Sequence, residues 1–212
     1  MKTIISLYFI VMMVGSAIAQ PTVCPCTPAT LLAHQERSGA KHDSNYSQYI
    51  HKKDTMTVNY IYAWQQKYTA QTNQIKTDPN NAASKRKHGT PEDTLYTLKG
   101  YMWFIKQEDD CDFHIEIGPK DAAGTRIVVE VAPENKALQN KIKQELDSRH
   151  LHIKGCTASS STDTHFKQGI PVVVTGLGFY DASHKPNTNH GDAHTKLYSW
   201  ELHPVKDVVF GK

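Results

Sequence analysis

The chain has 212 residues, 39% of them hydrophobic, and a formal net charge of +3. This length suits one domain of ordinary size, or a core domain with an N-terminal extension. So small a charge neither favours nor excludes nucleic acid, because a nucleic-acid binder is recognised by a clustered basic face. Beyond the N-terminus no stretch approaches the roughly 20 apolar residues of a membrane-spanning helix, which excludes an integral helical membrane protein.

The first nineteen residues have the layout of a cleavable secretory signal. A lone Lys2 precedes an apolar run over residues 4–14, and Ala17 and Ala19 stand just before Gln20. We therefore expect the mature protein to begin at Gln20 and to be soluble and secreted or periplasmic. The predicted organisation is a signal peptide over 1–19, a helical extension and linker over 20–93, and a β-rich domain over 94–212.

Residues 27–74 have a loosely amphipathic helical pattern. A first helix should follow Thr27 and end before Gly39, and Asp54 or Thr55 is a candidate cap for a second. Residues 77–93 are predicted to form an exposed linker with almost nothing to bury. The basic cluster at 85–88 lies inside this linker and is more typical of a solvated loop than of a binding face.

The chain from residue 94 onward is dominated by strand patterns. Strands are predicted over 96–105, 111–117 and 126–131, a helix over 134–149, and two further strands from 170 and over 197–210. Three strands, a helix and two strands are the connectivity of an OB-fold, a five-stranded Greek-key barrel. The predicted fold class is therefore mainly β with α: an OB-like barrel preceded by a helical N-terminal extension.

Acids and histidines alternate with apolar residues along three of these strands. A pleated strand sends alternate side chains to opposite faces. The apolar set should point inward: Phe113, Ile115, Ile117, Ile127, Val129, Val131, Trp200 and Leu202. The polar set should point outward: Asp112, His114, Glu116, Arg126, Glu130, Glu201 and His203. Because the third strand of an OB barrel lies between the second and the fifth, His114, Glu130 and His203 should form one patch.

The four cysteines of an exported chain suggest two disulfides. We predict that Cys111 pairs with Cys156, which would tie the second predicted strand to the loop after the helix. Cys24 and Cys26 are too close for an unstrained bridge. Three alternatives stay open for these two cysteines: pairing elsewhere, metal binding or a reactive thiol.

Four motifs of the predicted barrel resemble those of a group of uncharacterised small bacterial proteins. Those proteins carry a D-x-H strand, an I-x-E strand, V-T-G-V-G-F-F-D with a nearby histidine, and E-L-H-P-V. Here the corresponding stretches are residues 112–114, 128–130, 174–181 with His184, and 201–205. The segment 185–199 is longer and richer in histidine than that pattern. The resemblance implies the OB-like barrel and the choice of face, and it implies no activity.

A binding module for a protein or carbohydrate is the first functional hypothesis. OB barrels bind ligands on the outer face of their second and third strands, with aromatic rings beside polar groups. Tyr101 and Trp103 could supply the rings. The acids of the polar face would repel phosphates, which disfavours nucleic acid. The expected binding residues are Asp112, His114, Glu130, Asp181, His184, Glu201 and His203. The alternative is that this face only meets water.

A divalent-metal-dependent hydrolase, nuclease- or esterase-like, is the second hypothesis. His114, Glu130 and His203 combine imidazole and carboxylate, which suits zinc and related ions. An ion with an open position would activate water. No close-spaced metal motif is present, so folding would have to assemble this site, and with 12 histidines some proximity is expected by chance. Nucleophilic catalysis is rejected, because residues 159–161 lack a strand-to-helix elbow.

Overall fold

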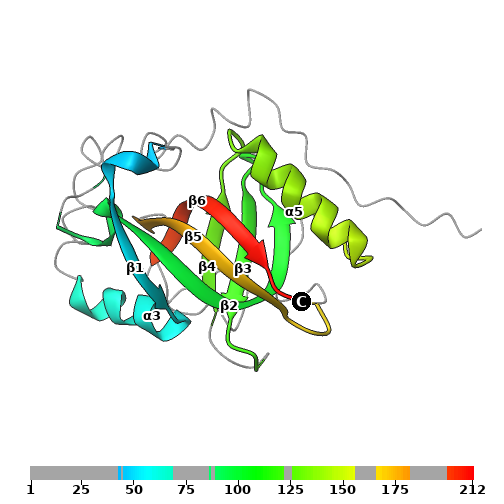
Figure 1. Cartoon of the computed structure of the whole chain (residues 1–212), viewed down its shortest axis with the longest axis horizontal. Helices are drawn as coiled ribbons and strands as arrows, with labels where there is room; N and C mark the ends of the chain where they lie inside the picture. Colours follow the sequence, from blue (N-terminus) through cyan, green and yellow to red (C-terminus); the bar gives the residue numbers. More distant parts are fainter. Residues whose placement is uncertain are drawn as a thin grey trace, which may run out of the picture.

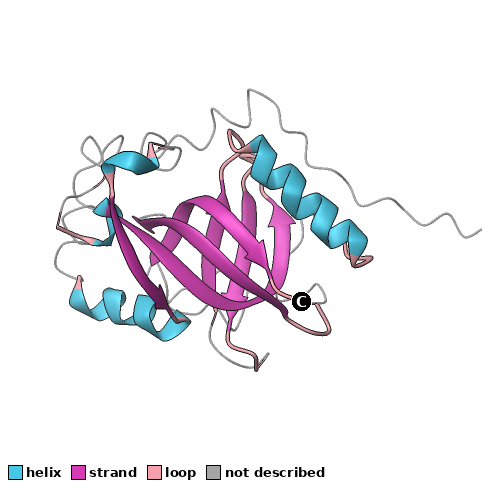
Figure 2. Cartoon of the chain, in the orientation of Figure 1, coloured by secondary structure: helices cyan, strands magenta, loops and turns pink. Residues whose placement is uncertain are grey.

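The computed structural model describes residues 43, 45–68, 86, 89–121, 126–155, 166–181 and 200–212. Its strands wrap into a barrel with one long helix along its side (Figures 1 and 2). The described elements are η1 (Tyr46–Gln48), β1 (Ile50–Met56), α3 (Val58–Lys67), η2 (Pro91–Asp93), β2 (Thr94–Gln107), β3 (Phe113–Gly118), β4 (Ile127–Val131), α5 (Lys136–Ser148), β5 (Ile170–Tyr180) and β6 (Trp200–Phe210).

The barrel closes through β2, which pairs with β3 on one side and with β5 on the other. The sheet order is β1-β2-β3-β4-β6-β5, and β4 lies parallel to β6 while the other barrel pairs are antiparallel. The single helix α5 connects β4 to β5. This topology confirms the predicted OB-like barrel, with β1 as an additional strand.

The barrel core consists of the predicted inward set. Ile115 of β3 pairs with Val129 of β4, and both are fully buried. Trp200 and Leu202 of β6 are fully buried in the same core. Helix α5 adds Leu138, Ile142 and Leu146, spaced one turn apart on its inner face. The alternation of β3 and β4 therefore places their apolar side chains inside the barrel, as predicted.

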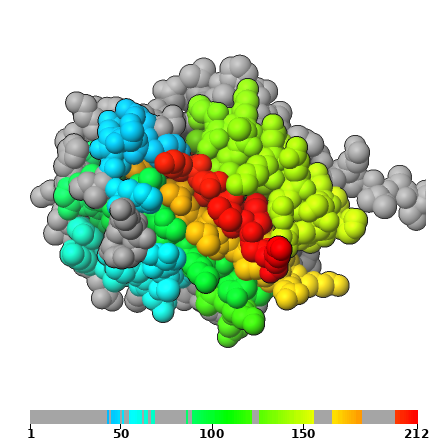
Figure 3. All heavy atoms as spheres, in the orientation of Figure 1, coloured from blue at the N-terminus to red at the C-terminus, as the bar shows by residue number. Residues whose placement is uncertain are grey.

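Helix α5 lies along β6 at the surface (Figure 3). Asn135 caps it by accepting a hydrogen bond from the backbone N–H of Leu138. On the outer side, Lys141 of α5 makes an ion pair of 2.9 Å with Asp207 of β6. The helix is two residues shorter at its start and one residue shorter at its end than the sequence predicted, because Pro133 and Glu134 belong to the preceding turn.

The chain before the barrel differs from the sequence prediction. Residues 50–56, expected to be helical, form β1, which lies parallel to the first half of β2. That half of β2 pairs with β5 on its other side and extends beyond the end of β3. β1 therefore pairs with the backbone groups of β2 that β3 does not reach. Non-local pairing here overrides the local helical pattern. The helix α3 begins after Thr57, later than Asp54 or Thr55.

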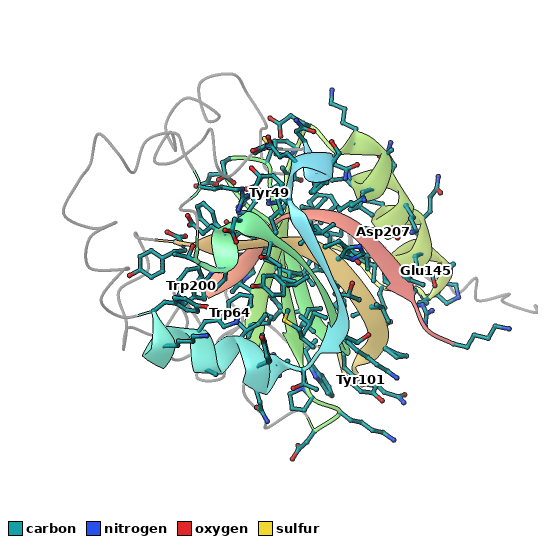
Figure 4. The ribbon with its side chains drawn as sticks, turned by 60° about the vertical axis from the view of Figure 1, so that its left-hand side comes forward. Tyr49, Trp64, Tyr101, Glu145, Trp200 and Asp207 are labelled. Atoms are coloured by element: carbon teal, nitrogen blue, oxygen red, sulfur yellow. The ribbon has the colours of Figure 1, made fainter. Side chains whose placement is uncertain are left out.

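Helix α3 attaches to the barrel through aromatic contacts. Trp64 is buried, and its ring centroid lies 4.7 Å from that of Tyr96 and 5.8 Å from that of Trp200. Figure 4 shows Trp64 and Trp200 side by side between α3 and β6. The apolar stripe that the sequence indicated on this helix is a packing surface, with Val58, Ile61 and Trp64 buried.

The expectation of an exposed linker is wrong for Arg86, Thr90 and Glu92, all of which are buried. Thr90 caps η2, and its hydroxyl accepts a hydrogen bond from the backbone N–H of Glu92. The Glu92 carboxylate in turn accepts one from the backbone N–H of Tyr180. Polar composition suggested a loop, but the side chains of Arg86 and Glu92 bind the backbone of β5 and β6, which sequence patterns do not reveal.

Several sequence predictions lie outside the described residues. These are the signal peptide, the helix after Thr27, Cys24, Cys26, Cys156, His184 and the histidine-rich segment 185–199. Among the described helices, none is long and apolar enough to cross a membrane.

Candidate metal centre

The polar face of the barrel is built by three neighbouring strands, β3, β4 and β6. His114 of β3 is directly opposite Glu130 of β4 in the antiparallel register. β6 joins β4 through the pair Val129 and Leu202, so the next residues, Glu130 and His203, lie on the same side. His114 and Glu130 are each flanked in sequence by core residues, and His203 follows the core residue Leu202, so the pleat sends all three to the outer face.

His203 is the centre of one set of contacts. Its Nδ1 lies 2.7 Å from Oε2 of Glu130 and 3.2 Å from Oε1 of Glu201. Its Nε2 lies 3.1 Å from Oδ2 of Asp112. Three carboxylates from three segments of the chain thus surround one imidazole.

His114 is the centre of a second set. Its Nδ1 lies 3.3 Å from Oε1 of Glu130 and 3.5 Å from Oε1 of Glu108. Its Nε2 lies 3.9 Å from Oε1 of Glu116. Arg126 completes this set, with Nη1 3.1 Å from Oε2 of Glu116. Glu108 lies between two predicted strands, and the sequence analysis missed it as a potential ligand.

The polar face is buried, contrary to the alternative that it only meets water. Asp112, Glu116 and His203 have no exposed surface, and Glu130, Glu201 and His114 expose 2%, 2% and 6%. The rings of Phe179 and Phe104 lie 5.4 Å and 6.5 Å from those of His203 and His114. Trp103 is also buried, with the Arg126 guanidinium 5.4 Å from its ring centroid, so it offers no exposed stacking surface.

Burial and neighbouring charges move the pKa values of these groups. Burial alone would lower the pKa of His203, but the charges of Asp112 and Glu130 outweigh it and raise that pKa well above its usual value. At His114, burial lowers the pKa of the imidazole, whereas hydrogen bonds to Glu116 and Glu130 raise it. The net effect raises this pKa to about 10. Burial is also the main cause of two raised carboxyl pKa values. The pKa of Glu201 rises to about 7, and the pKa of Asp112 is raised as well.

The charges of the face are unbalanced when both imidazoles are neutral. Five carboxylates take part in the contacts, those of Glu108, Asp112, Glu116, Glu130 and Glu201. Within the described part of the chain, fixed cations that contact them include Arg126 and Lys106, the latter 3.0 Å from Glu108. Buried carboxylates in such excess are costly unless positive charge is added. Protons on the histidines or bound metal ions would supply it.

Two groups of potential metal ligands occur among the described residues. One is Asp112, Glu130 and His203, and the other is Glu108, His114 and Glu130. In each group one ligand atom per residue lies within 4.8 Å of the others. The predicted ligands His114, Glu130 and His203 are all present, but the two histidines belong to different groups and Glu130 belongs to both.

The other predicted site residues do not belong to either ligand group among the described residues. Asp181 follows β5 and is half-buried, and its charge contributes to the raised pKa of Glu201. Glu201 contacts His203 without joining either ligand group. His184 lies outside the described residues. Cys111 is buried beside Asp112 with a left-handed φ of 73°, and because Cys156 is outside the described residues, their disulfide stays a prediction.

Arg86 binds the backbone next to the polar face, and the sequence analysis missed it as a site residue. It donates hydrogen bonds of 2.6 Å to the carbonyl oxygens of Gly178 and His203. Its guanidinium also lies 6.0 Å from the ring centroid of Phe179 and 5.6 Å from that of Tyr49. Arg86 therefore joins β5 to β6 at the backbone of His203. No local signal marked it, because a basic cluster in a polar segment is typical of a solvated loop.

A separate hollow of about 850 Å³ lies between the end of α5, the start of β5 and the last residue. Leu151, Phe166 and Ile170 contribute apolar surface to it, and Arg149 and Lys167 contribute cations. Arg149 is already paired with Glu145 at 2.6 Å. None of the residues of the polar face lines this hollow.

No protein family model matches the sequence, and no curated protein matches it. The proposals below therefore rest on the described residues and their chemistry.

Proposed function

We propose that this protein is an exported binding module whose ligand is a divalent metal ion, held by Asp112, Glu130 and His203. The observation that carries the proposal is the convergence of one ligand atom from each of these residues, all within 4.8 Å of one another. One imidazole and two carboxylates are a donor set that suits zinc and related ions.

The electrostatics of the face support a metal ion. A divalent cation would offset the excess of buried carboxylates without requiring both histidines to stay protonated. The nearly complete burial of all three ligands favours a closed site, which is typical of metal ions that are held for binding or stability. The ligands come from the segment before β3, from β4 and from β6, so an ion would join three parts of the barrel.

The test is the metal content of the untagged chain beginning at Gln20, measured by elemental mass spectrometry after dialysis against a weak chelator. We expect zinc, manganese or a similar ion to be retained, Glu130→Gln to lower the retained amount at least tenfold, and His203→Ala to lose one ion per chain. His152→Ala is the matched control, because the His152 side chain is 76% exposed and lies outside the polar face. Circular dichroism checks that each variant is folded.

Two results would overturn this proposal. The first is a wild-type protein that retains no metal and shows no thermal shift when zinc or manganese is added. The second is a folded His203→Ala variant with the same metal content as wild type and as His152→Ala.

Metal-dependent hydrolysis is a second candidate function, and the observation that favours it is Glu201. Its pKa of about 7 suits a general base at neutral pH, and its Oε1 lies 3.2 Å from Nδ1 of His203. A bound ion would polarise the ester. Glu201 would take a proton from water while the water oxygen attacks the phosphorus or carbonyl carbon. It would then return that proton to the leaving oxygen as the ester bond breaks, which releases the alcohol.

Hydrolysis is tested with bis(p-nitrophenyl) phosphate and p-nitrophenyl acetate, with manganese or zinc and with a chelator. We expect Glu201→Gln to retain metal but to lose at least a hundredfold of any metal-dependent rate, since general-base catalysis is worth about 10²–10⁴-fold. Equal rates for Glu201→Gln and wild type would remove Glu201 as the base. If neither ester is hydrolysed at a metal-dependent rate, hydrolysis is excluded and metal binding remains the proposed function.

A further inference from the structure

We propose that the polar face binds a second divalent ion between Glu108, His114 and Glu130, so that the carboxylate of Glu130 bridges two ions. This inference rests on the proposed metal binding and extends it from one ion to a pair.

The two oxygens of Glu130 contact different imidazoles. Oε1 lies 3.3 Å from Nδ1 of His114, and Oε2 lies 2.7 Å from Nδ1 of His203. Each of these imidazoles also contacts one further carboxylate: Nδ1 of His114 lies 3.5 Å from Glu108, and Nε2 of His203 lies 3.1 Å from Asp112. A carboxylate that presents one oxygen to each of two ligand groups is the arrangement that joins paired metal ions.

The second position has an accessible ligand that the first does not. The Glu108 side chain is 27% exposed, whereas the side chains of Glu130 and His114 are 2% and 8% exposed. Glu108 therefore connects the buried histidine with solvent and provides a path by which an ion can enter. Lys106 is 3.0 Å from the same Glu108 oxygen and is itself 22% exposed, so it can turn toward water when a cation takes its place.

The charge of the face is consistent with two ions. Among the contacts named above for the described residues, and with Lys106 turned to solvent, five ionised carboxylates exceed the guanidinium of Arg126 by four charges. Two divalent ions carry that charge, whereas one ion leaves half of it uncompensated in a buried region. Arg126 is held by Glu116 on the far side of His114, which leaves the Nδ1 side of that imidazole to Glu108 and Glu130.

The experiment is a titration of the metal-free chain from Gln20 with Mn²⁺, followed by elemental analysis and electron paramagnetic resonance. We expect two Mn²⁺ per chain and a spectrum of two magnetically coupled ions, because a shared carboxylate places them close together. His114→Gln and Glu108→Gln should each keep one Mn²⁺, with the spectrum of an isolated ion. His203→Gln should also keep one, and Glu130→Gln should keep none.

The outcomes separate this inference from the proposed function. One ion per chain that is lost in His203→Gln and retained in His114→Gln would overturn the second position and leave the proposed function standing. No bound ion in wild type would overturn both. Two ions without magnetic coupling, or two ions retained in Glu130→Gln, would overturn the bridge. His152→Ala must keep two coupled ions, since a loss there would show binding at exposed histidines only.

Discussion

His203 of β6 and Glu130 of β4 are far apart in the sequence, and Nδ1 of His203 lies 2.7 Å from Oε2 of Glu130. The parallel pairing of β4 with β6 brings them together, since Val129 and Leu202 form the pair just before them. The two β-strands can adjoin only because the chain crosses from β4 through α5 and β5 before it returns in β6. The topology of the barrel thus creates the contact on which the candidate centre depends.

The buried ion pair of Arg126 and Glu116 should matter far more than the exposed pair of Lys141 and Asp207. Arg126→Met leaves the charge of Glu116 buried without its guanidinium, a change that typically costs about 3–5 kcal/mol of unfolding free energy. Lys141 and Asp207 are 50% and 49% exposed, and Lys141→Ala should cost about 1 kcal/mol or less. Urea unfolding of the metal-free proteins measures both. Equal losses would show that burial does not determine the strength of these pairs.

The metal-free protein should become less stable as the pH rises from about 4.5 to about 10. The folded-state pKa of Glu201 is raised from 4.5 to about 7, so between these values the folded state holds a proton that the unfolded state has lost. His114, raised from 6.5 to about 10, acts in the same direction over the higher range. Both groups therefore contribute stability at low pH that is lost as the pH rises through their folded pKa values.

Chemical unfolding at several pH values in the presence of a chelator checks this dependence. Glu201→Gln should flatten the curve between about pH 4.5 and 7 and leave the higher range unchanged. Added metal should reverse the trend, because ligands must lose their protons to bind an ion. A metal-free stability that increases with pH over this range would contradict the assigned pKa directions.

Gly178 should be less tolerant of alanine than Gly89. A Cβ atom at Gly178 would lie 2.2 Å from the carbonyl oxygen of Pro91, so either η2 or β5 must shift. Overpacking of this kind typically costs about 1–3 kcal/mol, and the shift would also move the carbonyl that Arg86 binds. Gly89 has a φ of +75° and open space around it, so Gly89→Ala should cost only backbone strain of about 1–2 kcal/mol.

Thermal unfolding and metal retention together distinguish the two glycine variants. We expect Gly178→Ala to lose more stability than Gly89→Ala and to retain less metal, because Arg86 also binds the carbonyl of His203. If Gly178→Ala kept full metal content, the contact of η2 with β5 would not influence the centre.

Cys111 and Cys156 should form a disulfide in the mature protein. Peptide mapping by mass spectrometry without reductant is expected to find the two in one linked peptide. Loss of a native disulfide from a secreted domain typically costs about 2–5 kcal/mol, so Cys111→Ala with Cys156→Ala should lower the unfolding free energy by that order. A linked peptide that joins Cys111 to Cys24 or Cys26 would show that the pairing is different.

Local patterns in the sequence were enough to predict the barrel strands and the inner side of β3, β4 and β6. Phe113, Ile115 and Ile117 alternate with polar residues, and only one face of a pleated strand can enter a core. The spacing of Leu138, Ile142 and Leu146 likewise determined the buried side of α5. With one helix between the third and fourth barrel strands, these elements predicted the barrel and the neighbouring positions of His114, Glu130 and His203.

The burial of the polar face and the division of its residues into two ligand groups depend on tertiary contacts. Alternation assigns a side chain to a face, but it does not tell whether another segment covers that face. Arg86 and Glu92 belong to polar stretches, and their buried positions depend on contacts with distant backbone. Glu108 lies in the connection between β2 and β3, and its ligand-like position depends on its contact with His114. β1 is likewise set by the open edge of β2. Non-local pairing and the cost of buried charge, which no local pattern encodes, thus determine the candidate centre.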